Sequence, residues 1–415
     1  MEKLTQYVWK HKLFPLKELK TTDGMAIEVI DSGQQNFNAG ADFYNAKVKI
    51  DGTLWVGNIE IHEKSSDWYL HGHDKDKAYN NVILHVAEIV NSDVKTESGE
   101  YLPQLELPIP QKIADNYNEL LNADRYPPCY RIIPRLSKLM IHSWMNSLQT
   151  ERLEEKTQRI FAIADRCNGD WEKAYFCTLA RNYGFGINGD AFEAWALNLP
   201  LGSVAHHCDN LFQIEAIFLG QAGLLDEFNA KYKIAQEEFD KMKKEYAYLK
   251  HKFSLEPIDK CLWKYLRLRP NNFPNMKILQ LANLYFHRKA NLSVMLECKS
   301  VQDVRNLYRT NHSVIIQLTN SSVDLLIINT IVPMLFAYGK HMGEEEYCNR
   351  AFDFFDKLKA ENNHMIRMWA ECGLDVQSAG DSQALIQLKK EYCDKHECLR
   401  CRIGYEYLKG QKYDS

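Results

Sequence analysis

The 415-residue sequence lacks the features that mark several classes of protein. Its formal net charge is only −4, so there is no overall basic excess, and any phosphate-binding surface must be local. Its most apolar run, residues 323–338, contains Asn329 and Pro333 and is shorter than the ~20 residues that a spanning helix needs. We therefore expect a buried helix in this run and no association with a membrane.

Secretion signals and a disulfide framework are also absent. The N-terminus carries charges at Glu2, Lys3, Lys10 and Lys12 without the apolar segment of a signal peptide. The 11 cysteines are odd in number and scattered, which suits a reducing compartment better than an oxidising one. The sequence therefore predicts a cytoplasmic protein.

Common catalytic loops are missing as well. No G-x-S-x-G motif occurs, and the glycines of residues 184–189 follow no strand and precede no Lys-Ser/Thr pair, so they indicate a helix–helix turn. We also find no repeat of fixed period. These absences disfavour a nucleophile elbow, a phosphate-binding loop and a solenoid.

What the sequence does contain is an α+β pattern. Residues 43–50 and 53–64 alternate as two strands around Asp51-Gly52, a strong signal for a tight hairpin turn. Helical periodicity dominates from residue 132 onward. We predict a small mixed α/β module over residues 1–125 and a large all-α domain over residues 126–415. Further strands are expected at residues 26–30, 81–90 and 101–107, with helices at residues 1–12 and 111–121.

The hairpin carries a set of residues that suits metal-dependent chemistry. Asp42 begins the first strand, and Glu60, His62 and Lys64 alternate on one face of the second. Two such acids can hold Mg²⁺ or Mn²⁺, which polarises a phosphate and activates a water molecule. The arrangement resembles the PD-(D/E)xK core of restriction-endonuclease-like nucleases, which implies that fold, metal-dependent phosphodiester cleavage and a nucleic-acid partner.

The hairpin departs from that nuclease pattern at one important place. His62 occupies the position of the pattern's lysine, and Lys64 could replace the lysine from the same face. Alternatively, His62 is itself a base or a metal ligand. A third interpretation is that Asn58, Glu60, His62 and Lys64 form the solvent-facing side of a half-buried hairpin.

Histidines gather immediately after the hairpin. His71, His73 and His85 follow His62 closely, so four of the 14 histidines lie between positions 62 and 85. Imidazoles at this density favour a transition metal, although a lone histidine such as His85 in an apolar strand is often a core residue. We expect metal ligands among Asp42, Glu60, His62, His71, His73 and His85.

Three segments carry a family resemblance: residues 40–86, FLGQAGLL at 218–225, and LRLRPNNFP at 266–274. With them, nearly the whole chain resembles an uncharacterised bacterial family, domain of unknown function 2851. The resemblance implies one full-length architecture and a bacterial cytoplasmic setting. It implies no reaction.

A second metal site is suggested near the C-terminus. Cys393, His396, Cys398 and Cys401 lie together, and Cys398-x-x-Cys401 has the spacing of zinc and iron–sulfur ligands. His396, Cys372 or His364 could supply the fourth ligand. The alternative is a group of reduced cysteines that pack at a helix end.

A basic and aromatic segment, residues 263–269, could contact nucleic acid, but its position before Pro270 favours the end of an amphipathic helix.

Three functions stay open: a metal-dependent nuclease, a non-catalytic nucleic-acid or protein-binding module on a degenerate nuclease-like core, and a histidine-rich transition-metal site. The sequence indicates neither the substrate nor the oligomeric state.

Overall fold

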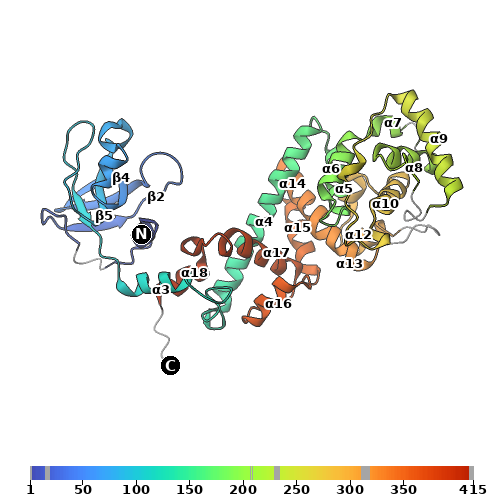
Figure 1. Cartoon of the computed structure of the whole chain (residues 1–415). Coiled ribbons are helices and arrows are strands. Elements are labelled where there is room, and N and C mark those ends of the chain that lie inside the picture. Colours follow the sequence, from blue (N-terminus) through green and yellow to red (C-terminus); the bar gives the residue numbers. More distant parts are fainter. Residues whose placement is uncertain are drawn as a thin grey trace. The chain divides into compact units, whose positions relative to one another are not determined.

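A computed structural model describes residues 2–14, 19–205, 207, 209–228, 234–309 and 318–410 (Figure 1). The chain forms two compact units. Unit 1 comprises residues 1–141, 371–374 and 388–415 and contains the β-sheet, whereas unit 2 comprises residues 142–370 and 375–387 and is helical. The predicted α+β class is confirmed. Unit 1 thus contains the C-terminal segment as well as the N-terminal one.

The sheet of unit 1 has the order β1-β3-β4-β5-β6, with β2 paired to β3. β1, β3 and β4 are mutually antiparallel along this order, whereas β4, β5 and β6 are parallel. β1, β3, β4, β5 and β6 overlap the strands predicted from the sequence, whereas β2 lies where no strand was predicted. Their bounds are Ile27–Asp31 (β1), Gln34–Gln35 (β2), Phe43–Ile50 (β3), Thr53–Lys64 (β4), Val82–Ile89 (β5) and Gln104–Glu106 (β6).

The β3–β4 hairpin has a tight turn and two irregularities. Asp51 and Gly52 have φ of 48° and 81°. A two-residue hairpin turn needs positive φ at both residues for its twist to match the twist of the two strands. The pairing register shifts between Phe43 and Ala46 on one side of β4, and between Asn58 and Ile59 on the other. Such bulges change the direction in which side chains point, and these two lie beside the predicted site.

A crossover connects the parallel strands β4 and β5, as parallel pairing requires. It consists of α2 (Asp67–Leu70), η1 (His73–Lys75) and η2 (Lys77–Tyr79). Trp68 of α2 is fully buried, and its indole N–H donates to the carbonyl of Lys95 at 2.8 Å. This anchor holds the crossover, which carries His71 and His73, against the sheet.

Helices complete unit 1. Lys112 Nζ and Asn116 Nδ2 of α3 donate to the carbonyls of Gly410 (2.8 Å) and Tyr407 (3.2 Å) at the C-terminal end of α18. The C-terminal segment is thereby tied to the N-terminal one. The helices are α1 (Glu2–Lys10), α3 (Gln111–Leu121), η3 (Ile133–Arg135), η8 (Leu388–Cys393), η9 (Cys398–Arg400) and α18 (Arg402–Lys409).

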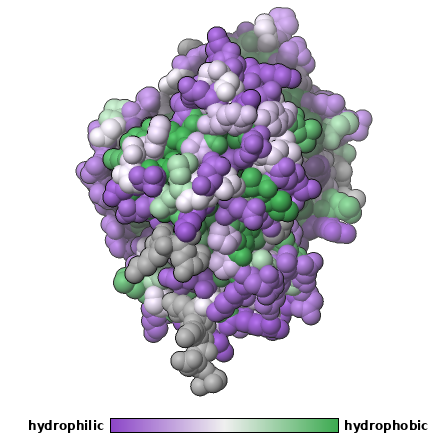
Figure 2. All heavy atoms as spheres, turned by 90° about the vertical axis from the view of Figure 1, so that its left-hand side faces the viewer, coloured by the Kyte–Doolittle hydropathy of each residue, from purple (hydrophilic) through white to green (hydrophobic). Residues whose placement is uncertain are grey.

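Apolar side chains also reach the surface of unit 1. On the face shown in Figure 2, green apolar patches alternate with more extensive polar areas. The exposed apolar side chains of this unit include Ile30, Phe37, Leu54, Trp55 and Val56, and the last three follow the hairpin turn.

Unit 2 is built from helices around one apolar core, in which Phe176, Trp195 and Phe218 are almost completely buried. Their ring centroids lie 5.2–6.0 Å apart in tilted and edge-to-face pairs. The helices are α4 (Lys138–Arg166, which begins in unit 1), α5 (Trp171–Tyr183), α6 (Gly189–Asn198), α7 (Leu201–Ala205), α8 (Leu211–Gln221), α9 (Gln236–Phe253), α10 (Pro274–Phe286), α11 (Leu292–Glu297), α12 (Val301–Leu307), α13 (Asn320–Leu326), α14 (Val332–Met342), α15 (Glu345–Lys357), α16 (His364–Glu371) and α17 (Ala379–Gln387).

The apolar run forms a longer helix than expected, because α13, a π-helical turn (Ile327–Ile331) and α14 are continuous over Asn320–Met342. Pro333 has no N–H for the carbonyl of Asn329, and Asn182 Nδ2 donates to that carbonyl instead, at 2.9 Å. Among the described residues, this is the one helix with the length and hydropathy to cross a membrane, and 72% of its most apolar window is buried. The prediction of a buried helix is confirmed.

The expected helix end at residues 263–269 is wrong. After a short 3₁₀ turn (Lys260–Leu262) this segment is irregular, with Trp263 buried and Leu266 81% exposed. The side chain of Asn188 bonds both the N–H and the carbonyl of Lys264, each at 2.8 Å. A side chain thus satisfies backbone groups that helical bonds would otherwise have used.

Glu215 of α8 provides a test of burial in unit 2. Burial, together with the carboxylate of Glu238, raises the pKa of Glu215 from 4.5 to about 7. The unfolded chain therefore ionises first as the pH rises, so stability falls between these two pKa values. We expect Glu215→Gln to stabilise the protein by about 1–2 kcal/mol at about pH 8, and to lose this advantage near pH 4.

Urea unfolding at the two pH values measures this difference. Glu237→Gln makes the same chemical change at an exposed position of α9, where solvent screening should keep its effect below about 0.5 kcal/mol at both pH values. An effect of Glu215→Gln that does not depend on pH would contradict the prediction.

Candidate functional site

The two acids predicted from the hairpin lie side by side. The backbone N–H of Asp42, just before β3, donates to Glu60 Oε2 at 3.1 Å. The backbone N–H of Ile61 donates to Asp42 Oδ2 at 2.9 Å. Each carboxylate is thus held by the neighbouring strand, and we refer to Asp42 and Glu60 as the carboxylate pair.

The polar face of β4 is buried. Asn58, Glu60 and His62 are only 7%, 5% and 1% exposed, because other elements of unit 1, the crossover among them, cover this part of the strand. The interpretation of this face as a solvated hairpin surface is therefore wrong, except at Lys64, which is exposed. Burial and the nearby Glu60 raise the pKa of Asp42. Two acids buried together favour a cation that would compensate their charge.

Two imidazoles lie against Glu60, and a third lies beside them. His73 Nε2 lies 3.2 Å from Glu60 Oε1, and His62 Nε2 lies 3.7 Å from the same oxygen. One ring nitrogen from each of His62, His71 and His73 lies within 4.8 Å of the others. We call these three residues the histidine cluster. His71 is exposed, so it forms the side of the cluster that solvent can reach.

A chain of hydrogen bonds places the ring proton of His62 on Nδ1. Its other ring nitrogen, Nε2, faces the carboxylate pair and carries no proton. Gln104 Nε2 donates to the carbonyl of Ser92 (3.0 Å), so its Oε1 accepts from His85 Nδ1 (3.2 Å). His85 Nε2 then accepts from His62 Nδ1 at 2.9 Å. The remaining nitrogen, His62 Nε2, carries the lone pair and is available to His71 Nδ1 (3.1 Å) or to a metal.

Burial keeps the rings of His62 and His85 neutral. It lowers the pKa of His62 to about 2, with further lowering by His85, His73 and His71. Burial also lowers the pKa of His85 to about 4. Neutral imidazole is the form that binds transition metals.

Aromatic rings and an amide support the site. The ring of His73 stacks on Tyr79 with centroids 3.8 Å apart, and Trp68 lies edge-on to both His73 and His85. From α1, Gln6 Nε2 donates to Asp42 Oδ1 at 3.0 Å. We did not predict Gln6 or Gln104 from the sequence, because a glutamine in a helix or a short strand has no distinguishing local pattern.

The remaining predicted residues take more peripheral places. Both ring nitrogens of His85 are engaged by His62 and Gln104, so His85 orients His62 from behind. Lys64 lies at the exposed end of β4, and its side chain makes no hydrogen bond to the carboxylate pair in the described part of the chain. At the C-terminus, Cys398 and Cys401 share one 3₁₀ turn, whereas His396 is exposed.

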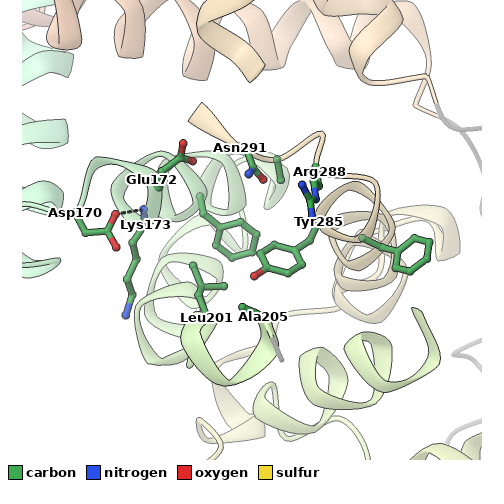
Figure 3. A pocket seen from close by; sticks show the side chains of 11 residues that line it. Asp170, Glu172, Lys173, Leu201, Ala205, Tyr285, Arg288 and Asn291 are labelled. Carbon is green, nitrogen blue, oxygen red and sulfur yellow. Dashed lines mark hydrogen bonds between the residues drawn. The ribbon is translucent and has the colours of Figure 1, made fainter. Parts of the chain in front are cut away.

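Unit 2 contains a separate cavity of about 520 Å³, shown in Figure 3. Asp170 Oδ1 accepts the N–H of Lys173 at 3.0 Å and so caps α5. Glu172 accepts the N–H groups of Leu292 (2.7 Å) and Ser293 (3.1 Å) at the start of α11. Both acids of the cavity thus serve helix ends, because they accept N–H groups at the starts of α5 and α11.

Comparison with known proteins yields one result. A family model described as protein of unknown function (DUF2851) matches residues 2–364, which include the carboxylate pair and the histidine cluster. No curated protein matches the chain, and no solved structure matches it. Since the family model covers most of the chain, this protein belongs to the DUF2851 family of proteins of unknown function.

Proposed function

We propose that the protein is a metal-dependent hydrolase that cleaves phosphodiesters, with nucleic acid as its substrate class. The observation that carries this proposal is the buried junction of the carboxylate pair with the histidine cluster, centred on Glu60. Acids and neutral imidazoles that meet within one small site form a donor set for a divalent transition metal.

The donor set indicates which metal suits the site. Glu60, His62, His71 and His73 would hold the ion, with Asp42 beside them. Carboxylates alone suit Mg²⁺, whereas added imidazoles favour Mn²⁺, Fe²⁺ or Zn²⁺. A bound ion of this kind polarises a phosphoryl oxygen and lowers the pKa of a bound water.

The residues of the chain have distinct roles in this proposal. Glu60 and the histidine cluster bind the ion, and the His85–Gln104 pair orients the His62 ring. His71, as the exposed member, marks the side from which substrate approaches. Lys64, exposed at the end of β4, is a cation that can contact the substrate's phosphates.

The topology supports a phosphodiester as the substrate. The elements follow the order of the PD-(D/E)xK core: an acid before one strand of a hairpin, an acid on the returning strand, and a parallel strand after a crossover. The departure is position 62, where the nuclease pattern has lysine.

One observation favours a second function. Both ring nitrogens of His62 have partners, His85 and His71, so His62 is not free to act as a general base without rearrangement. A protein that binds metal and nucleic acid without cleaving it would fit this arrangement.

The decisive experiment incubates the purified full chain with single-stranded and double-stranded DNA and RNA, with Mn²⁺ or Mg²⁺ added. We expect cleavage with Mn²⁺ to exceed cleavage with Mg²⁺, and we expect Asp42→Asn to lower the rate about a hundredfold or more. Asn keeps the size of the side chain and can still accept from Ile61, so circular dichroism should show an intact fold.

Asp51→Asn is the matched control, because it makes the same chemical change at the exposed hairpin turn, where asparagine is well tolerated. This variant should cleave like the parent. Metal binding without cleavage of any of these polymers would refute the hydrolase and favour the second function.

A further inference from the structure

Three arginines of unit 2 meet on one buried carboxylate. Glu193 of α6 is only 9% exposed. Its Oε1 accepts from Arg166 Nη1 at 2.9 Å, and its Oε2 accepts from Arg159 Nη2 at 3.1 Å and from Arg181 Nη1 at 2.9 Å. We call Arg159, Arg166 and Arg181 the arginine cluster.

The arginine cluster holds more positive charge than its acids compensate. Among the described residues, Asp190 is the one other acid in ion-pair contact with it, since Asp190 Oδ1 lies 2.7 Å from Arg181 Nη1 and 4.0 Å from Arg159 Nη2. The side chain of Asp190 is 93% exposed, so solvent weakens both contacts. Three guanidinium groups thus meet two carboxylates, and the repulsion that remains among the guanidinium groups favours a further anion.

Most donors of the arginine cluster have no acceptor in the described part of the chain. A guanidinium has five N–H donors, and the bonds to the two acids use a single nitrogen of each arginine. The side chains of Arg159 and Arg166 are 52% and 57% exposed, so their remaining donors are open to solvent. Planar donors that are already held in place match the oxygens of a phosphate.

The basic segment of residues 263–269 is fixed to the same helix as the buried carboxylate. Asn188, the residue before α6, bonds both the N–H and the carbonyl of Lys264 with its side chain, each at 2.8 Å. Trp263 is buried, and its ring centroid lies 4.9 Å from that of Phe192 on α6. The segment therefore lies at the end of α6 where the helix begins.

This segment presents cations to solvent. Lys264, Arg267 and Arg269 are all exposed, and Leu266 among them is 81% exposed. Arg267 has φ of 64°, a strained conformation for a residue other than glycine and one that is common at binding sites. Lysine and arginine contact phosphates, and an exposed apolar side chain between them can contact sugars and bases.

We propose that unit 2 binds the sugar-phosphate backbone of nucleic acid through the arginine cluster and the exposed cations of residues 263–269. These groups supply the local basic surface that a chain with a net charge of −4 needs for such a ligand. Contacts to phosphates bind any sequence, because the backbone is the same at every position. The inference rests on the proposed function for its substrate class, but the binding requires neither metal nor cleavage.

The test measures binding of the purified full chain to fluorescently labelled single-stranded DNA, double-stranded DNA and RNA. Anisotropy is recorded in EDTA at several salt concentrations, and the polymer bound most tightly identifies the source of the phosphates. We expect binding that persists in EDTA and weakens steeply as salt is added. Combining Arg267→Gln with Arg269→Gln should weaken binding about tenfold and reduce the slope of log affinity against log salt by about 2.

A second variant and a control separate binding from folding. Arg166→Gln removes one member of the arginine cluster and should weaken binding about fivefold, with a slope reduced by about 1. If this variant does not fold, the double variant still decides, because both of its positions are exposed. Arg131→Gln is the matched control, since Arg131 is an exposed arginine of unit 1 that pairs with Glu119, and it should change neither quantity.

Two results would overturn the proposal. One is binding that is absent in EDTA, and the other is a double variant with the affinity and salt slope of the parent. Binding in EDTA without cleavage in Mn²⁺ would refute only the hydrolase, so the two proposals fail separately.

Discussion

Replacing Glu60 with glutamine is expected to lower the affinity of the chain for Mn²⁺ by about a hundredfold or more, and to reduce any hydrolysis at least as much. Glu60 is the residue on which the site converges, since its two carboxylate oxygens lie near the Asp42 N–H, His73 and His62. Glutamine preserves the shape but removes the negative charge. Isothermal titration with Mn²⁺ measures the affinity, and the cleavage assay measures the rate.

Glu63→Gln is the matched control for this substitution. Glu63 lies on the same strand but is exposed, so its charge contributes little to a buried ion. We expect Mn²⁺ affinity within about twofold of the parent. Unchanged Mn²⁺ affinity in Glu60→Gln, with an intact fold, would show that the ion does not bind at the carboxylate pair.

The largest effect on stability is expected from Gly220→Ala in α8. A Cβ at position 220 would overlap the ring of Tyr246 on α9, so the two helices would have to separate or the ring would have to leave its place. Tyr246 is buried and its hydroxyl accepts from Gln221 Nε2 at 2.9 Å, so the ring cannot move freely. We expect a loss of about 3 kcal/mol, measured by urea unfolding.

Two further variants isolate the cause of this loss. Gly202→Ala also adds a methyl group to a helix, but nothing lies within 4 Å of the new atom, so it should be neutral or stabilise by about 0.5–1 kcal/mol. Combining Gly220→Ala with Tyr246→Ala should cost less than the sum of the two single changes by about 1 kcal/mol or more. Additive effects would mean that the ring and the glycine do not compete for the same space.

The strand pattern shows how far sequence reasoning reached. Alternation over residues 43–64 around Asp51-Gly52 was sufficient to predict both strands of the hairpin and its turn, because a tight turn and a period of two are local properties. The region of the candidate site followed from the same pattern, since acids and histidines are dense there. The α+β class followed from the change of periodicity along the chain.

The environment of these residues was decided by the tertiary structure. The same alternation fits a polar face in water and a polar face under a crossover, and only long-range packing buries Glu60 and His62. Gln6 and Gln104 enter the site from α1 and β6, tens of residues away. Such contacts cannot be predicted from local sequence, because they depend on how distant segments pack.

The cysteines illustrate the same division. The sequence by itself determined the x₄ and x₂ spacing of Cys393, Cys398 and Cys401, because three ligands on one short segment are a local pattern. Only the tertiary structure shows that this C-terminal segment folds into unit 1, where α3 donates hydrogen bonds to the end of α18, since a chain's folding determines which distant residues become neighbours.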